Sequence, residues 1–148
     1  VEVGLWHSGQ QCEEGVDMQV ILIGDAPPNT PDEVRRKRDD HGGADYWAAA
    51  PFAGAVSAAA EAAALGARGV PVHAFYVRRG EDVQREYEAL SRATGGAAGF
   101  LDIESAEGAR LLTDTVAQEI LRRVGGEPLG DTYVRQYQDL YGSCSYTR

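Results

Sequence analysis

Asp25 is the residue of this sequence whose position is best suited to chemistry. It follows the apolar run Met18 to Ile23 (MQVILI) after one glycine, and it opens a loop with three prolines between residues 27 and 31. Ligands of α/β sheets bind at the carboxyl ends of strands, so a carboxylate there can act as a metal ligand or as a nucleophile. It can equally accept a hydrogen bond that closes the Pro-Pro turn. The neighbouring residues leave these roles open.

No other set of residues has the spacing of a known catalytic motif. The three histidines lie far apart, and His73 sits inside an apolar run (VPVHAFYV), which predicts a core or sheet-face histidine. The chain contains no G-x-S-x-G elbow and no phosphate-binding glycine loop. Gly95-Gly96 is better explained as the end of a helix. We therefore expect a chain that is not an enzyme, with a hydrolase-type or nucleotide-dependent enzyme using Asp25 as the alternative.

The net charge of −9 argues against nucleic acid and anionic membrane surfaces as partners. Both are bound through basic faces, because phosphate contacts dominate the affinity. The one basic cluster, Arg35 to Arg38, is followed directly by Asp39 and Asp40, which is typical of a solvated helix face. No apolar run approaches the roughly 20 residues that a membrane span needs. The composition is that of a soluble globular protein.

Two cysteines, Cys12 and Cys144, lie near opposite ends of the chain. Neither belongs to a C-x-x-C or metal-type spacing, and two isolated cysteines are not a disulfide framework. Two free thiols are the favoured interpretation, although a pair could form if the termini meet. The cellular compartment stays open on this evidence.

Strands and helices are predicted to alternate along the chain. The apolar, β-branched run Met18 to Ile23 is typical of a strand buried on both faces, whereas the last strand is short and expected near an edge. Such alternation implies a mostly parallel sheet with helices on both faces, a three-layer α/β architecture. The expected strands are 18–23, 70–77 and 98–103, and the expected helices are 1–11, 32–38, 46–67, 81–93, one starting at Ser105, and 132–141.

Three helices carry more specific predictions. Thr30 is expected to cap the helix that begins at Pro31, with Glu33 at its third position. The helix after Ser105 is expected to bury its apolar side. The closing tyrosines either form a partner surface or dock the last helix on the sheet. The residues of these last two groups are Leu111, Leu112, Val116, Ile120 and Leu121, and Tyr133, Tyr137, Tyr141 and Tyr146.

The ordered set of these segments resembles the later strands of von Willebrand factor A-type domains. The similarity rests on ILIGDAPPN (21–29), VPVHAFYV (70–77), TGG (94–96) and FLDI (100–103). GLWHS (4–8) is similar to the helix before the fourth strand in an intracellular-looking branch of that family, which favours an intracellular location. The resemblance covers about residues 1–126 and implies the C-terminal half of such a domain, with residues 127–148 as a helical extension.

The family often carries a metal-ion-dependent adhesion site, and Asp25 is the position that matches one of its ligands. Mg²⁺ or another divalent cation prefers oxygen ligands and keeps open positions that a partner's acidic side chain can fill. The chain contains no Asp-x-Ser-x-Ser motif, however; Ser143 and Ser145 have the hydroxyl spacing but lack the Asp. The metal site is therefore incomplete in this chain.

The resemblance implies a protein-binding module whose metal site is completed by upstream or partner residues. Three upstream strands of the family fold are absent, so an apolar sheet edge is expected to pair with the missing half, a second copy or another protein. The alternative from a different class is a structural subunit of a larger assembly in which the metal site is vestigial.

Overall fold

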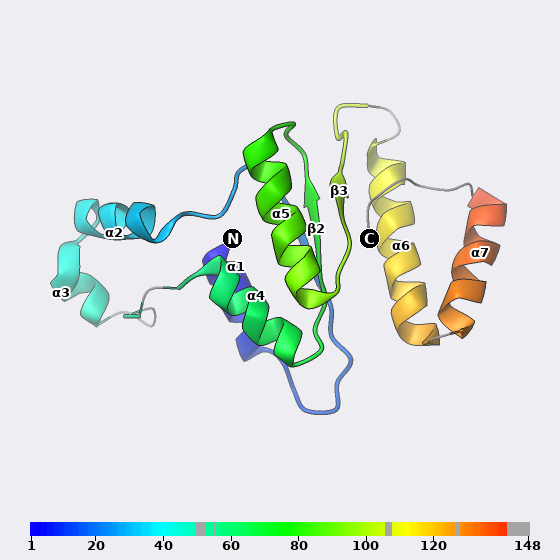
Figure 1. The fold of residues 1–148 in the computed structure, drawn as a ribbon, viewed down its shortest axis with the longest axis horizontal. Coiled ribbons are helices and arrows are strands. Elements are labelled where there is room, and N and C mark those ends of the chain that lie inside the picture. The colour runs from blue at the N-terminus through cyan, green and yellow to red at the C-terminus, as the bar shows by residue number, and fades with distance from the viewer. Residues whose placement is uncertain (50–52, 55, 106–107, 127, 142–148) are drawn as a thin grey trace.

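The computed structural model contains seven helices and three strands among its described residues, which are 1–49, 53–54, 56–105, 108–126 and 128–141, without the side chains of Ala109 and Leu111. No helix in these ranges is long and apolar enough to cross a membrane. Figure 1 shows the elements in order: α1 (Glu2–Gln10), β1 (Val20–Gly24), α2 (Pro31–Asp40), α3 (Gly43–Ala48), α4 (Ala58–Ala67), β2 (Val72–Tyr76), α5 (Glu81–Thr94), β3 (Ala98–Phe100), α6 (Gly108–Gly125) and α7 (Leu129–Tyr141).

The three described strands form one parallel sheet in the order β1-β2-β3. Every residue of the central strand β2 is buried, as the run VPVHAFYV predicts. The short strand β3 pairs only with β2, so its expected place near an edge is confirmed among the described strands. The α/β class of the sequence prediction is therefore correct, with a smaller sheet than a complete domain of the suggested family would have.

The prediction for β1 is wrong in its burial. The run Met18 to Ile23 was expected to be buried on both faces, but Val20, Ile21 and Leu22 are only half-buried and Ile23 is 44% exposed. The reason is topological: β1 pairs with β2 on one side, and no described strand lies on the other. An apolar run specifies a strand, but whether its two faces are covered depends on its neighbours.

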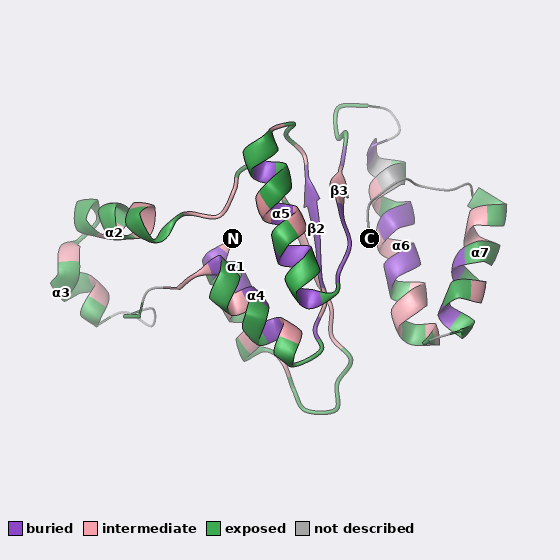
Figure 2. Ribbon diagram, in the orientation of Figure 1, coloured by how far each residue is buried: buried purple, intermediate pink, exposed green. Residues whose placement is uncertain are grey.

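One face of the sheet carries the apolar core. Val72 lies there together with Leu5 of α1, Leu65 of α4 and Leu90 of α5, all buried in one cluster. Val20 and Leu22 of β1 pack against this cluster from the sheet edge. In Figure 2 the buried positions of α5 face β2, and α4 and α1 extend the same layer. These helices fix the carboxyl ends of β1 and β2 relative to one another.

The helix expected over residues 46–67 is two helices, α3 and α4. Residues 53, 54, 56 and 57 are described and not helical, while residues 50–52 and 55 lie outside the described ranges. Ser57 has the extended backbone of an N-cap (φ −118°, ψ 127°), so a new helix begins after it. The high alanine content predicted helix throughout, but the break around Gly54 places α2 and α3 apart from the sheet (Figure 1).

Helix α6 covers the opposite face of the sheet (Figure 1), and the buried side of α6 is polar. The apolar side of α6 was expected inside, yet Ile120 is 44% exposed, and Leu112, Val116 and Leu121 are half-buried; the Leu111 side chain lies outside the described set. The polar side of α6 faces the sheet because β2 directs the buried, polar His73 to this face, where Glu119 of α6 lies beside it. Besides Gly108, the buried residues of α6 among those whose side chains are described are Asp114, Thr115, Gln118 and Glu119.

The last predicted helix is confirmed as α7, which packs against α6. Tyr137 donates a hydrogen bond to the Asp114 carboxylate (2.8 Å) and stacks at an angle on Tyr141 (4.8 Å between ring centroids). Tyr133 is 37% and Tyr141 56% exposed, and Tyr146 lies outside the described residues. Tyr137 therefore docks α7 on α6 rather than on the sheet, while a partner surface at the exposed Tyr133 and Tyr141 stays a prediction.

Candidate functional site

Asp25 lies at the carboxyl end of β1, where the sequence predicts a site, and its side chain is exposed. Arg78, just after β2, donates from Nε to the Asp25 backbone carbonyl (2.7 Å) and pairs with Asp82 in the first turn of α5 (3.4 Å). The loops after two neighbouring strands and the start of α5 are thus joined at one edge of the sheet. This edge is where ligands of parallel α/β sheets bind.

Tyr87 anchors the loop after β1 to α5. Its side chain is buried, and its hydroxyl donates to the carbonyl of Ala26 (3.3 Å). Burial, and after it the charge of the Asp25 carboxylate, raise the pKa of the Tyr87 hydroxyl, which therefore keeps its proton for this bond. Position 24 requires glycine, because a Cβ there would overlap the Tyr87 hydroxyl. The close approach sets the direction in which the chain leaves β1.

The described residues do not by themselves make a metal site around Asp25. No group of three or more His, Cys, Asp or Glu side chains in these ranges is arranged to hold a metal ion. The Arg78 guanidinium donates to the Asp25 backbone carbonyl, and its positive charge disfavours a metal cation close by through Coulomb repulsion. Mg²⁺ at Asp25 therefore stays a prediction that needs ligands from outside the described residues.

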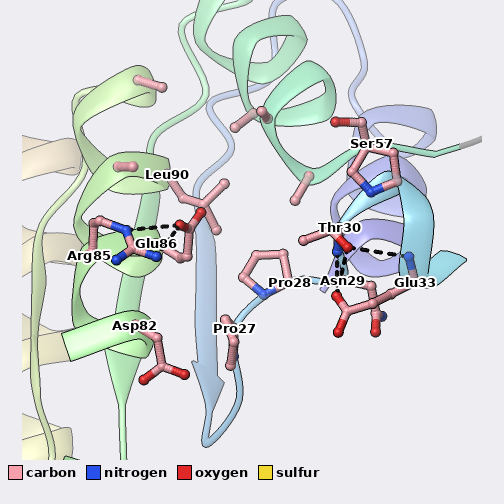
Figure 3. Close-up of a pocket in the computed structure, with 16 residues that line it drawn as sticks. Pro27, Pro28, Asn29, Thr30, Glu33, Ser57, Asp82, Arg85, Glu86 and Leu90 are labelled. Carbon is pink, nitrogen blue, oxygen red and sulfur yellow. Dashed lines mark hydrogen bonds and ion pairs between the residues drawn. The ribbon is translucent and has the colours of Figure 1, made fainter. Parts of the chain in front are cut away.

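A groove of about 450 Å³ begins beside this edge (Figure 3). Its volume is in the range of ligand-binding clefts. The loop from Pro27 to Pro31 forms one end, and the facing surfaces of α4 and α5 form its sides. The part of the groove between α4 and α5 is apolar, because α4 contributes Ala58, Ala59 and Ala62 and α5 contributes Ala89 and Leu90. In Figure 3, the charged side chains of α5 and the Thr30–Glu33 pair stand on opposite sides of Pro27 and Pro28.

The charged side chains along the groove are mostly acidic. They comprise the carboxylates of Glu33, Asp82 and Glu86 and the guanidinium of Arg85, a formal charge of −2. Hydrogen bonds from the Thr30 backbone N–H and hydroxyl hold the pKa of Glu33 below its usual range. The backbone N–H of Val83 does the same for the pKa of Asp82. Both carboxylates are therefore ionised at neutral pH.

Thr30 and Asn29 have the structural roles that the sequence allows. The Thr30 hydroxyl accepts from the backbone N–H of Glu33 (3.2 Å), and the Glu33 carboxylate accepts from the backbone N–H of Thr30 (2.8 Å), so the predicted cap is a complete capping box. The Asn29 backbone N–H donates to the Glu2 carboxylate, which ties the loop to α1. Both residues hold the proline loop in place as the end wall of the groove.

His73 is a buried histidine, as predicted from its place in the strand. Its Nδ1 accepts from the backbone N–H of Ala97 (3.1 Å), and Glu119 of α6 lies 3.5 Å away. The Glu119 carboxylate accepts from Arg122 (2.5 Å). This polar cluster joins β2, β3 and α6 at the amino end of the sheet, away from Asp25.

Cys12 has no disulfide partner among the described residues, and its thiol donates to the carbonyl of Ser8 (3.3 Å). Its sulfur lies 3.5 Å from that of Met18. Cys144, Ser143 and Ser145 lie outside the described residues, so pairing of the cysteines and any role of the two serines stay predictions.

The groove is the feature that sequence reasoning misses. The prolines indicate a loop and the alanines indicate a helix, but nothing in either pattern says that the two meet. The spacing of Asp82, Glu86, Ala89 and Ala93 does place these residues on one face of α5, and this was the available signal. No family model matches the chain, and no curated protein or solved structure matches it either.

Proposed function

We propose that this chain is a protein-binding α/β module of the von Willebrand factor A type, whose sheet is extended by a strand from outside the described residues. The observation that carries the proposal is the state of β1. An apolar strand of a parallel sheet, with Ile23 44% exposed, has no described neighbour on one side. Parallel sheets are normally covered on both faces, and open edges are templates for pairing.

The hydrogen-bond register supports this reading of β1. Val20 donates to Pro71, and Gly24 accepts from Val77, so these alternate residues direct their backbone groups to β2. Because neighbouring residues of a strand point their backbone groups to opposite sides, Ile21 and Ile23 direct theirs to the open edge. A strand laid along this edge would satisfy these backbone groups. The Ile23 side chain points to the same face as its register partner Phe75, the face that meets α6, so a segment connected to the added strand would have to cover it there.

Exposed apolar residues on the α6–α7 side of the molecule favour the same interpretation. Val124 is 79%, Leu129 47% and Ile120 44% exposed. An additional strand beside β1 brings its own connecting segments, and these can cover such residues. The carboxyl-end loops with Asp25 then lie beside the added strand, as in the adhesion domains that the sequence resembles.

Amide hydrogen exchange tests the edge directly. Peptides selected from a displayed random library, or an upstream extension of the chain, should slow exchange of the Ile21 and Ile23 amides. Ile23→Pro should abolish this binding, because proline lacks the outward N–H, whereas Ile23→Ala keeps that N–H and should retain most of it. A chain that remains a monodisperse monomer and yields no segment protecting these amides contradicts the proposal.

Calorimetric titration with Mg²⁺ or Mn²⁺ tests the metal part. Binding by an upstream-extended chain that is lost in Asp25→Asn supports a divalent-metal site completed from outside. If neither the present chain nor the upstream-extended chain binds the metal ion, the structural-subunit alternative is favoured. This alternative is supported by the contact of Arg78 with the Asp25 backbone carbonyl, because a positive charge there opposes a metal ion.

A further inference from the structure

We propose that the groove between α4, α5 and the proline loop binds a partner segment that carries a lysine or arginine next to a small apolar side chain. This inference deepens the proposed function and rests on it, since it assigns the chemistry of a protein partner. It concerns a surface separate from the open edge of β1, so the two can be tested apart.

The shape of the groove favours an extended chain segment. The C-terminal ends of α4 and α5 approach closely: a Cβ on Gly66 would lie 2.5 Å from the carbonyl oxygen of Ala93. Nearer their N-terminal ends, Ser57 and Asp82 lie on opposite helices along the groove, and the proline loop closes the space between them (Figure 3). The result is a slot with methyl groups at its base, which accommodates apolar side chains of modest size.

The charge of the groove selects a cation. Three carboxylates and one guanidinium line it, and Arg78 beside it pairs with Asp82, so one negative charge remains in excess there; the whole chain has a net charge of −9. A groove lined by one sign of charge concentrates ligands of the opposite sign and raises their association rate. An acidic segment would meet repulsion at the same positions.

Glu86 can release Arg85 and bind a cationic group of a partner instead. The two groups are 3.1 Å apart, and their side chains are 69% and 42% exposed. Ion pairs this exposed contribute little to stability. Glu86 can therefore turn from Arg85 to a partner's ammonium or guanidinium group at small cost, while the apolar part of the groove holds the neighbouring side chain.

The walls of the groove are preorganised. The Thr30–Glu33 capping box fixes one side, and the Tyr87 hydroxyl holds the Ala26 carbonyl before the prolines. Proline itself restricts the backbone to one φ region. A rigid groove loses little conformational freedom on binding, which increases affinity.

Fluorescence anisotropy with labelled peptides tests the inference on the intact chain. The probes are a short peptide of alternating lysine and alanine or leucine residues and a second peptide with glutamate in place of each lysine. The lysine peptide should bind, and added salt should weaken its binding. Equal binding of both peptides, or binding of the glutamate peptide alone, would overturn the inference.

Filling the groove should block the peptide. Ala59→Leu adds a larger side chain at an exposed position of α4 that lines the groove, and Ala63→Leu makes the same change at an exposed position of α4 outside it. Leucine is a good helix former, so both variants should fold. We expect Ala59→Leu to weaken lysine-peptide binding by about tenfold or more, which is about 1.4 kcal/mol, and Ala63→Leu to leave it unchanged. Equal effects of both changes would contradict binding in the groove.

Removing one charge from the rim gives a second, independent test. Glu86→Gln lowers the negative charge of the groove, and Glu88→Gln lowers the charge of the chain equally from a position outside it. Only Glu86→Gln should weaken the lysine peptide and reduce its salt dependence. Equal weakening by both variants would mean that net charge alone attracts the peptide, and the inference would fall.

Ile23→Pro separates this inference from the proposed function. Groove binding should survive this change at the edge of β1. If the lysine peptide fails to bind while other segments still protect Ile21 and Ile23 from exchange, the groove inference is wrong and the proposed function stands. If the peptide binds in the groove but no segment protects the edge, the proposed edge pairing is wrong and the assignment of the groove stands.

Discussion

The two faces of the sheet are covered by different chemistry. On one face, Val72 packs with Leu65 and Leu90 in an apolar cluster. On the other, His73 meets Glu119 of α6, with Gln118 and Thr115 fully buried nearby. Residues adjacent in β2 thus point into environments that are stabilised by different forces.

The two faces contribute differently to the stability of the fold and to the orientation of its elements. Apolar burial is non-directional and contributes roughly 25 cal/mol per Å². Buried polar groups contribute little net stability, but they are costly when one partner is lost, so they specify one arrangement. We infer that the α4–α5 face holds the fold together, whereas the α6 face fixes how α6 lies on the sheet.

Leu65→Ala should have the largest effect and would break the apolar face. Leu65 is 1% exposed in the core cluster, and truncation of a buried leucine typically costs about 2–5 kcal/mol. Ile120→Ala on α6, where the side chain is 44% exposed, should change the stability by only about 0.5 kcal/mol. Urea denaturation of the two variants measures both values. Similar losses would show that α6 contributes an apolar core of its own.

Glu119→Ala should be next and would break the polar face. It removes a buried carboxylate that accepts from the partly exposed Arg122 at 2.5 Å, and loss of a hydrogen bond to a charged group costs about 1.5–3 kcal/mol. The double variant Glu119→Met with Arg122→Met should recover most of the loss, because apolar replacement of a buried pair is often neutral. A double variant less stable than Glu119→Ala would show that the ion pair itself stabilises the fold.

Gly24→Ala should destabilise the fold at the end of β1, where the apolar face ends. The new methyl group would overlap the buried Tyr87 hydroxyl, and such overpacking costs about 1–3 kcal/mol. Tyr87→Phe removes the obstructing oxygen, so the double variant should be more stable than the sum of the single changes predicts, by about 0.5 kcal/mol or more. Additive effects in a thermal-unfolding cycle would rule out this contact.

Acidification should have the smallest effect on stability. It tests the cap of α2, which lies on neither face of the sheet. The pKa of Glu33 is lowered in the folded chain, first by the backbone N–H of Thr30. Its contribution is therefore present above the ordinary value of 4.5 and is lost as the pH falls through the folded pKa. Amide shifts of Thr30 and Glu33 followed by NMR should report the loss of the cap only at pH values below this ordinary value. Glu33→Gln should remove this response without changing either face.

The sequence predicts the fold class and the cap of α2 well, because both are local signals. Hydrophobic periodicity marks the strands and α5, and Thr30, Pro31 and Glu33 specify the capping box through groups within three residues. The helix break near Gly54 and the polar side of α6 were predicted wrongly, because alanine content and apolar spacing cannot show which surface a segment will face. For the candidate site, Asp25 was located correctly at the end of its strand, but the groove beside it was not predicted.

The alternation of strands and helices, the position of Asp25 after β1 and the acidic character of the chain follow from the amino-acid sequence alone, since each depends on neighbouring residues or on composition. The edge of β1 that no described strand covers, the contact of His73 with Glu119 and the groove that the proline loop closes between α4 and α5 become visible only in the folded chain. These features join residues from separate parts of the chain. Their energies depend on distance and burial in space, which a linear pattern does not encode.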